Sequence, residues 1–419
     1  MFDFFRGSDF RDSIISRASA ISGEKQRKIV FADSDDFIIE AASLVKKKRV
    51  AQPIILGDSK KILSAFRRLK VSNLEEENII DFASPQNREQ LEKFASEFTE
   101  MKKHDGKPIS DKDALDKMSR PHYYGAMLVK KGLAHGLVSG ASSETKPYYP
   151  VFEIVKLAPG VSRASGVFLM VDRPGKSVYF LADCVMNMSP DSEQLAEIAT
   201  LTAKTCLGFG IEPKVAMLSF STRDSAKHES VERVKLATAM LKRKHPGMVV
   251  DGEIQLDAAV VPEVMQRKCA DSPLKGEANV LIFPDLNSGN IGYKLVERLG
   301  GYEAIGPFLQ GAALPVNDLS RGCSARDVLY VAAVTVIQSK VLEEPHGFSG
   351  SGEPEPGHDE ESHESHPKPH HAGHGHKPQA HSSGKNFTPL ERLPSNVRKI
   401  IEDGMKNKGK SSGGDRDSD

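Results

Sequence analysis

Residues 311–330 have the sequence GAALPVNDLSRGCSARDVLY, which predicts a polar loop followed by an apolar helix. Pro315 and Gly322 are typical of the loop, and the run VLYVAAVTVI after Asp327 has the length of a helix. Ser324 stands three residues before Asp327, the spacing of a helix N-cap with an acid in the first turn. The sequence therefore predicts a helix N-terminus directly after a loop rich in polar side chains.

A helix N-terminus offers unpaired N–H groups to an anion. The polar residues that the sequence places around this one are Asn317, Asp318, Ser320, Arg321 and Asp327. They are candidates for an anion site, although the local pattern also fits a capped surface helix.

Elsewhere, short apolar segments alternate with helical ones, which predicts an α/β fold whose parallel strands are covered on both faces. In the first part of the chain, strands are expected at 28–33, 53–58, 78–84 and 137–141. The alternation resumes from residue 151, with strands expected at 166–171, 178–183, 215–220, 248–252 and 279–283. The first two of these are expected to be neighbours joined by the DRPGKS turn. Residues 1–18 are expected to form a first helix packed on the body.

Hydroxyl and acidic residues follow several predicted strands, and they are Asp183, Ser219, Ser221, Asp251 and Asp285. Ligands of open α/β sheets bind beyond the carboxyl ends of strands, so these residues are expected to form one wall of a cleft. The alternative is that they are helix caps and turn residues.

Composition and motifs exclude several classes of protein. The chain has neither a G-x-G-x-x-G after a strand nor a P-loop sequence, which gives no support to a dinucleotide fold. No apolar run approaches the roughly 20 residues of a membrane span. The 419 residues carry no formal net charge, which gives no general argument for nucleic acid. The four cysteines are widely spaced, which argues against a zinc site or a disulfide framework and favours the cytoplasm.

The segment PVNDLSRGCS, followed by Asp327, closely resembles the characteristic sequence of the phosphate acetyltransferase (phosphotransacetylase) group of the phosphate acetyl/butyryl transferase family. The resemblance covers about residues 25–342 and includes HYYGAMLVKKGLAHGLVSGA, GVSRASGVFLM, FLADCVMNMSPDSEQLAEIA, VAMLSFSTRDSAKH, DGEIQLDAAVVPEV and NVLIFPDLNSGNIGYKLVERLG. These segments occur in the family's order, which makes the resemblance specific.

The resemblance implies two α/β/α domains with the active site in the cleft between them, related to the isocitrate dehydrogenase-like architecture. Domain I is expected at 1–156 with a return segment at 313–342, and domain II at 157–312. Ser320 and Asp327 are expected close to the loop 139–146. A homodimer is also implied.

The implied reaction is the reversible conversion of acetyl-CoA and phosphate into CoA and acetyl phosphate, with coenzyme A as a substrate and without metal, other cofactor or covalent intermediate. By resemblance, Asp327 deprotonates coenzyme A, Ser320 stabilises the tetrahedral transition state, and Arg321 holds the acyl phosphate. Their chemistry agrees with these roles, because acyl transfer needs a base, an oxyanion donor and a cation for phosphate. Cys184 and Cys323 have no His or basic partner nearby in sequence and are expected to be packing residues.

The chain departs from the family at two places. The stretch that resembles LRKHKG in the family is EMKKHDG here, with Lys102. Before PVFEIVK the chain has SSETKPYY, with Tyr149 nearest the family's arginine and Lys146 three residues earlier. The residues expected to contact substrate are Asn317, Tyr293, Lys102, Lys146 and Ser139. Because of these departures, two alternatives stay open: a non-catalytic or regulatory homologue, and a phosphate acyltransferase for propanoyl or butyryl groups.

After Leu342 the composition changes abruptly. Residues 343–385 contain almost no aliphatic side chain and nine of the 14 histidines, and we expect a disordered linker. Weak binding of a transition metal by its histidines is the alternative. Residues 386–419 have an apolar pattern from which we expect a short amphipathic helix, interpreted either as a frayed tail or as a docking peptide for a partner. Deletion of 343–419 is expected to leave folding and acetyl transfer unchanged.

Overall fold

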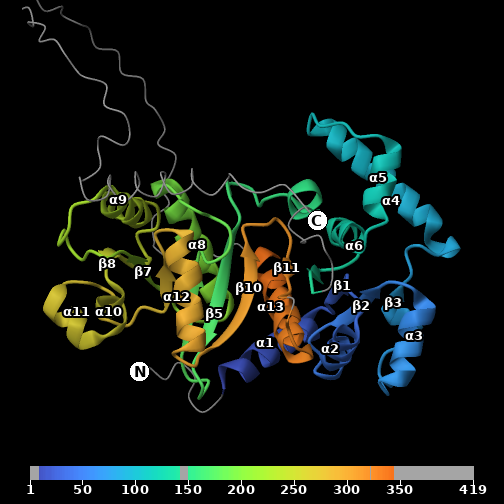
Figure 1. Cartoon of the computed structure of the whole chain (residues 1–419), viewed down its shortest axis with the longest axis horizontal. Coiled ribbons are helices and arrows are strands. Elements are labelled where there is room, and N and C mark those ends of the chain that lie inside the picture. Colours follow the sequence, from blue (N-terminus) through green and yellow to red (C-terminus); the bar gives the residue numbers. More distant parts are fainter. Residues whose placement is uncertain (1–8, 142–149, 321, 344–419) are drawn as a thin grey trace, which may run out of the picture. The chain divides into compact units, whose positions relative to one another are not determined.

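Two β-sheets carry the fold of the residues that the computed structural model describes, which are 9–141, 150–320 and 322–343 (Figure 1). The first sheet is parallel throughout, in the order β11-β4-β1-β2-β3. Its strands are β1 (Lys28–Phe31), β2 (Gln52–Leu56), β3 (Ile79–Ile80), β4 (Gly136–Ser139) and β11 (Val316–Asp318). They are short and mostly apolar, as expected for a parallel sheet that helices cover on both faces.

The second sheet has the order β10-β5-β6-β9-β7-β8 and is mixed. Its strands are β5 (Ser165–Val171), β6 (Val178–Ala182), β7 (Lys214–Leu218), β8 (Val249–Ile254), β9 (Val280–Ile282) and β10 (Glu303–Gln310). The predicted pairing of β5 with β6 is confirmed, and it is antiparallel because the connecting turn is too short for a crossover. β10 also pairs antiparallel with β5, and the other three strands run parallel to β6.

Helices connect the strands in the alternation that the sequence predicts. In the first part of the chain these are α1 (Phe10–Glu24), α2 (Asp36–Lys47), α3 (Ser59–Arg68), α4 (Arg88–His104), α5 (Asp111–Met118) and α6 (Pro121–Lys130), with short helical segments η1 (Glu76–Asn78), η2 (Pro85–Asn87) and η3 (Val151–Val155). In the second part they are α8 (Ser192–Gly208), α9 (Glu229–Lys244), α10 (Leu256–Val260), α11 (Pro262–Lys268), α12 (Leu286–Arg298) and α13 (Ala325–Glu343). Among the described helices, no segment has the length and hydropathy that a membrane span requires. The predicted α/β class is confirmed.

Three elements differ from the sequence-based expectation. The strand expected at 78–84 is only Ile79–Ile80, because η1 occupies Asn78 and polar residues follow. The sequence also predicts one helix at 256–268, which the structure divides into α10 and α11, since Pro262 has no N–H to continue the helical hydrogen bonds. The helix expected at the N-terminus is present from Phe10, with one buried apolar face.

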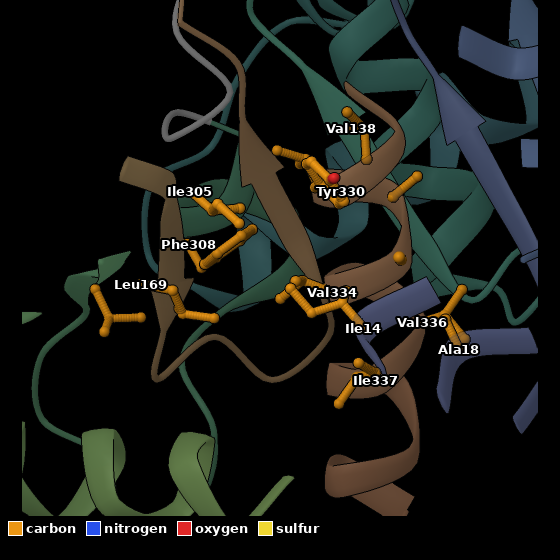
Figure 2. Packing of buried hydrophobic residues seen from close by; sticks show 14 of the residues in the cluster. Ile14, Ala18, Val138, Leu169, Ile305, Phe308, Tyr330, Val334, Val336 and Ile337 are labelled. Carbon is orange, nitrogen blue, oxygen red and sulfur yellow. The ribbon is translucent and has the colours of Figure 1, made fainter. Parts of the chain in front are cut away.

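Helix α13 is buried over most of its length. All ten residues from Val328 to Ile337 are buried, so this helix has no polar face over that length. It contacts α1, α2 and β4 on the side of the first sheet and α8 and β10 on the side of the second. Figure 2 shows side chains of α13 in one cluster with those of α1, β4, β5 and β10. An apolar helix of this kind needs cover on all sides.

The strands of the first sheet fall within 1–156 and 313–342, and those of the second within 157–312. The proposed division into two domains stays a prediction, because the described residues form one unit. Helix α1 also links the two sheets. It packs on α13, while the Phe10 N–H donates to the Gly175 carbonyl at 2.8 Å, in the turn between β5 and β6.

The end of α13 is anchored by a pair of hydrogen bonds between Arg27 and Glu343. Both terminal nitrogens of Arg27 donate to the two Glu343 oxygens, each at 2.7 Å. The Arg27 side chain is buried, so loss of its partner would leave a buried charge uncompensated. Glu343 therefore belongs to the described fold, although the change in composition after Leu342 placed it in the linker. A deletion that leaves the described fold whole begins at residue 344.

The hydrogen bonds from Arg27 lower the pKa of Glu343 from 4.5 to about 2. Because the pKa is depressed in the folded state, the pair stabilises the fold above about pH 4.5, and this contribution is lost as the pH falls toward 2. We predict that Glu343→Gln lowers the melting temperature by a few degrees at pH 7. The difference from the unsubstituted chain should shrink across that interval in thermal melts followed by circular dichroism.

The matched control is Glu24→Gln. It breaks the exposed pair of Glu24 with Lys340, which joins the end of α1 to the same helix, α13, and should contribute little. A melting difference for Glu343→Gln that stays constant with pH would contradict the prediction.

Candidate active site

A cavity of about 500 Å³ lies beside the start of α13. Three parts of the chain form its wall: Phe168 of β5 with residues 303–306 of β10, one face of α12, and part of the segment 319–331. Ser320 and Asp327, two of the three residues predicted to be catalytic, both line it. The cavity thus brings residues next to the first sheet into contact with a wall formed by the second.

Asp327 lies in the first turn of α13, where Ser324 precedes the helix. The Ser324 N–H and hydroxyl both donate to Asp327 Oδ2 at 2.8 Å, and the Asp327 N–H donates to Ser324 Oγ at 3.3 Å. This reciprocal arrangement is a capping box, and it confirms the predicted helix start. The other oxygen, Oδ1, accepts no hydrogen bond from the described residues, and the side chain is exposed. The carboxylate therefore has one oxygen fixed and one available.

Ser320 lies in the turn that leads into α13. It is exposed, and its carbonyl accepts a hydrogen bond from the Cys323 N–H at 3.1 Å. Burial and the negative charge of Asp327 raise the pKa of Cys323 to about 11, with Asp33 and Asp318 acting in the same direction. The Cys323 thiol therefore stays protonated at neutral pH, which agrees with its interpretation as a packing residue.

Helix α12 gives the cavity an aromatic and cationic wall. Tyr293 stacks on Phe168 of β5, with ring centroids 4.1 Å apart and an angle of 18° between the planes. Lys294 lies over the Tyr293 ring at 5.3 Å from its centroid. Arg298 completes this face and pairs with Glu297 at 3.4 Å. Of the predicted substrate contacts that the structure describes, only Tyr293 lines the cavity.

Glu303, at the start of β10, lies in the cavity wall and is held from outside by α1. The Arg11 guanidinium donates to Glu303 at 2.7 Å and also binds Asp9 at 2.8 Å. The Arg11 side chain is only 11% exposed, so this pair is shielded from solvent on the arginine side. The charge of Glu303 is thereby compensated, and β10 is tied to the N-terminal helix.

Lys102 lies away from the cavity in a charged cluster. Its ammonium group is 3.4 Å from Glu153, which also accepts hydrogen bonds from Lys117 at 2.8 Å and from the Tyr123 hydroxyl at 2.5 Å. Burial opposes ionisation of Glu153, but the hydrogen bonds from Lys117 and Tyr123 prevail and lower its pKa. In this structure Lys102 therefore pairs with a carboxylate and does not face the cavity.

Asn317 and Ser139 are fully buried at neighbouring strands of the first sheet. The Asn317 amide is bonded to Leu309, Thr335 and Gln338. The Ser139 hydroxyl has no hydrogen-bond partner among the residues that the structure describes. Neither residue lines the cavity. The described part of the chain does not include Arg321, Lys146 or most of the loop 139–146. The roles predicted for these residues stay predictions.

The residues that follow the strands of the second sheet do not form a wall of this cavity. Asp183 accepts hydrogen bonds from the backbone of residues 166 and 185–187, and Asp285 caps α12. Asp251 pairs with Arg223 and Lys242. The Ser221 N–H donates to Ser219 Oγ at 3.2 Å, and the Ser221 hydroxyl donates to Glu253 at 3.0 Å. These contacts agree with the alternative interpretation, in which such residues are caps and turn formers.

Sequence inspection missed several residues around the site. Asp33 follows β1 and accepts hydrogen bonds from the N–H groups of Gly140 and Ala141, at 2.8 and 3.2 Å, which fixes the turn after β4. Its position at the end of the first predicted strand was the available signal. For Lys294 and Arg298 the signal was their spacing of four, which places both on one face of α12.

Two further observations concern cysteine and metal chemistry. Burial raises the pKa of Cys184 well above its usual range, so this thiol is also protonated at neutral pH. Among the described residues, no three His, Cys, Asp or Glu side chains gather in a way that would hold a metal ion. The features present are a capped acid, a hydroxyl and a partly cationic cavity wall, the components of a site for acyl transfer to or from an anion.

Comparison with known proteins gives the family. The model of the phosphate acetyl/butaryl transferase family matches residues 9–336. The chain is 45% identical over 317 residues to a phosphate acetyltransferase of Bacillus subtilis (strain 168), which covers 75% of this chain and 95% of the relative. It is 44% identical over 337 residues to one of Thermoanaerobacterium thermosaccharolyticum, covering 78% and 98%. The chain therefore belongs to the phosphate acetyl/butaryl transferase family and is an acyltransferase.

Solved structures agree with this placement. A phosphotransacetylase from Streptococcus pyogenes has a TM-score of 0.73 at 41% identity and covers 78% of this chain and 98% of its own. The EutD phosphotransacetylase from Staphylococcus aureus has a TM-score of 0.72 at 40% identity and covers 80% and 100%. The family and the fold predicted from the sequence are confirmed.

Proposed function

We propose that this chain is a phosphate acetyltransferase, which transfers an acetyl group reversibly between coenzyme A and inorganic phosphate. The observation that carries the proposal is that Ser320 and Asp327 line one cavity, each with an atom available to a substrate. The similarity to relatives that are named phosphate acetyltransferases supports the same activity.

In the proposed mechanism, Asp327 Oδ1 takes the proton of the coenzyme A thiol, and the thiolate attacks the carbonyl carbon of acetyl phosphate. The Ser320 hydroxyl donates to the oxyanion of the tetrahedral intermediate. The C–O bond to phosphate then breaks, phosphate leaves with its electron pair, and the thioester remains. In the reverse direction, phosphate attacks acetyl-CoA and Asp327 returns the proton to the thiolate. By resemblance, Arg321 holds the acyl phosphate.

The phosphate groups of coenzyme A need cations, and α12 supplies two at the cavity wall. Lys294 and Arg298 are both exposed there, one turn apart. Lys294 lies over an aromatic ring and donates to Asn290 Oδ1 at 2.5 Å, and neither partner carries a charge. The Arg298–Glu297 pair is exposed on the arginine side, so it competes weakly with a phosphate. These two residues, together with Tyr293, are proposed as contacts for coenzyme A.

Arsenate-dependent breakdown of acetyl-CoA by the purified chain tests the proposed function. Arsenate takes the place of phosphate, and the acetyl arsenate formed decomposes in water, so release of free thiol reports acetyl transfer. We expect thiol release that depends on both arsenate and enzyme. Comparison with propanoyl-CoA and butyryl-CoA in the same assay gives the acyl preference. Absence of arsenate-dependent release with all three would favour a non-catalytic homologue.

We predict that Asp327→Asn and Ser320→Ala each lower kcat by at least roughly 100-fold, the usual scale for loss of a general base or an oxyanion donor. The control is Asp113→Asn on α5. Ser110 and Asp113 share two of the three hydrogen bonds of Ser324 and Asp327, since the Asp113 N–H donates to Ser110 Oγ and the Ser110 hydroxyl donates to Asp113, but they do not line the cavity. Near-normal turnover of Asp327→Asn would exclude Asp327 as the base, and an equal loss in Asp113→Asn would indicate a general effect of helix capping.

We also propose a homodimer in which α12 contributes to the interface. Ile291, Leu295 and Leu299 recur every four residues along this helix and are 57%, 51% and 82% exposed. An aliphatic stripe of this length on a surface is typical of a protein–protein contact. Light scattering should give a dimer mass for the unsubstituted chain and a monomer mass for Leu295→Glu. Leu236→Glu on α9, an equally exposed leucine, is the control and should stay dimeric. A monomeric unsubstituted chain would refute the dimer.

The cytoplasm is the proposed location. The four cysteines are free thiols, three of them buried, which suits a reducing compartment. The interpretation of residues 386–419 as a docking peptide for a partner remains a proposal that rests on their amphipathic pattern alone, because these residues lie outside the described part of the chain.

A further inference from the structure

Asn317, Gln338 and Leu309 form a closed ring of hydrogen bonds. The Asn317 side-chain nitrogen donates to Gln338 Oε1 at 2.7 Å, the Gln338 nitrogen donates to the Leu309 carbonyl at 3.0 Å, and the Leu309 N–H donates to Asn317 Oδ1 at 2.9 Å. Asn317 also donates to the Thr335 hydroxyl at 2.8 Å. Both amide atoms of Asn317 are therefore used inside the protein.

The ring joins the edges of the two sheets. Leu309 lies on β10, the edge strand of the second sheet, and faces Gly166 of β5 on its inner side. Asn317 lies on β11, the edge strand of the first sheet. An edge strand has backbone groups that no further strand satisfies. Here the N–H and carbonyl of Leu309 are satisfied by the side chains of Asn317 and Gln338, so the ring replaces strand pairing between the sheets.

Each element that meets at the ring also reaches the cavity. On β10, residues 303–306 form part of the cavity wall, and the same strand continues to Leu309. On β11, Asn317 is followed three residues later by Ser320. On α13, Asp327 and Gln338 lie on one continuous helix. The separation between the β10 wall and the two reacting side chains therefore depends on how firmly these three elements are held together.

We propose that Asn317 and Gln338 are positioning residues for acyl transfer, which fix the β10 wall of the cavity relative to Ser320 and Asp327. This inference rests on the proposed function of those two residues. It gives Asn317 a role other than the substrate contact predicted from its sequence position, because its side chain is fully buried and its amide is occupied. A small displacement of reacting groups lowers turnover strongly, since the rate depends on near-attack geometry.

The variant that opens the ring is Gln338→Leu. Gln338 is only partly buried, and leucine has a similar size and helix propensity, so the fold should be retained. The matched control is Ser339→Ala. Ser339 is the next residue on α13, is buried, and its hydroxyl donates only to the Val336 carbonyl of the same helix. The control therefore removes one side-chain hydrogen bond from α13 without touching either sheet edge.

In the arsenate assay, we expect Gln338→Leu to lower kcat roughly 10- to 100-fold, because a misplacement of about 1 Å can cost about 100-fold. The KM for acetyl-CoA should stay within about threefold of the unsubstituted value, because the α12 wall is unchanged. Gln338→Glu should behave like Gln338→Leu, since a carboxylate accepts from Asn317 but cannot donate to the Leu309 carbonyl. Ser339→Ala should keep nearly full kcat.

A second measurement does not need activity. Amide hydrogen exchange of a peptide that contains 303–310 should be faster in Gln338→Leu than in the unsubstituted chain and unchanged in Ser339→Ala. Full kcat in Gln338→Leu, an equal loss in Ser339→Ala, or unchanged exchange of that peptide would each overturn the proposal. If the unsubstituted chain transfers no acetyl group, the proposed function fails. In that case faster exchange in Gln338→Leu alone would still support the ring as the link that holds β10, and unchanged exchange would refute it.

Discussion

The constraint on which this structure depends is the burial of α13 on all sides. Ten consecutive residues of this helix, from Val328 to Ile337, leave no polar face to turn toward water. The hydrophobic effect stabilises such a helix only if other elements cover its apolar side chains. The two sheets, together with α1, α2 and α8, provide this cover. This requirement explains why the chain goes back to the first sheet after β10 and then places α13 against elements of both sheets. The cavity lies where that buried helix begins.

Much of the fold was predictable from local patterns because parallel strands and their helices have strong periodic signals. The strands at 28–31, 52–56 and 165–171 are apolar runs of the expected length, and their neighbours are amphipathic helices. The start of α13 was predictable for a different reason, since Ser324 and Asp327 have the spacing of a capping box. The strand predicted at 78–84 is too long, and the cause is also local. A 3₁₀ turn ends at Asn78, and the hydrophobic pattern of the sequence does not indicate it.

The site was predictable only in part, because a residue type does not tell which way its side chain points. Asp327 and Ser320 lie on the cavity as expected, whereas Asn317, three residues before Ser320, is directed into the protein. Lys102 illustrates a second difficulty. Lys102 is predicted to contact substrate because its stretch resembles one of the family, but Glu153 is remote in sequence and close in space, and it pairs with Lys102. Partners of this kind come from tertiary structure, which single-sequence patterns do not contain.

The capping box at the start of α13 has a consequence for how this site tolerates change during evolution. The carboxylate that is proposed to accept a proton also holds the N–H and hydroxyl of Ser324 and so keeps the first turn of the helix closed. A longer acid at this position would reach further into the cavity but would alter the cap. A shorter side chain would provide neither the hydrogen bonds of the cap nor the carboxylate that acts as the base. Selection for helix stability and selection for chemistry therefore act on the same atoms, and sequence drift at residue 327 is restricted twice over.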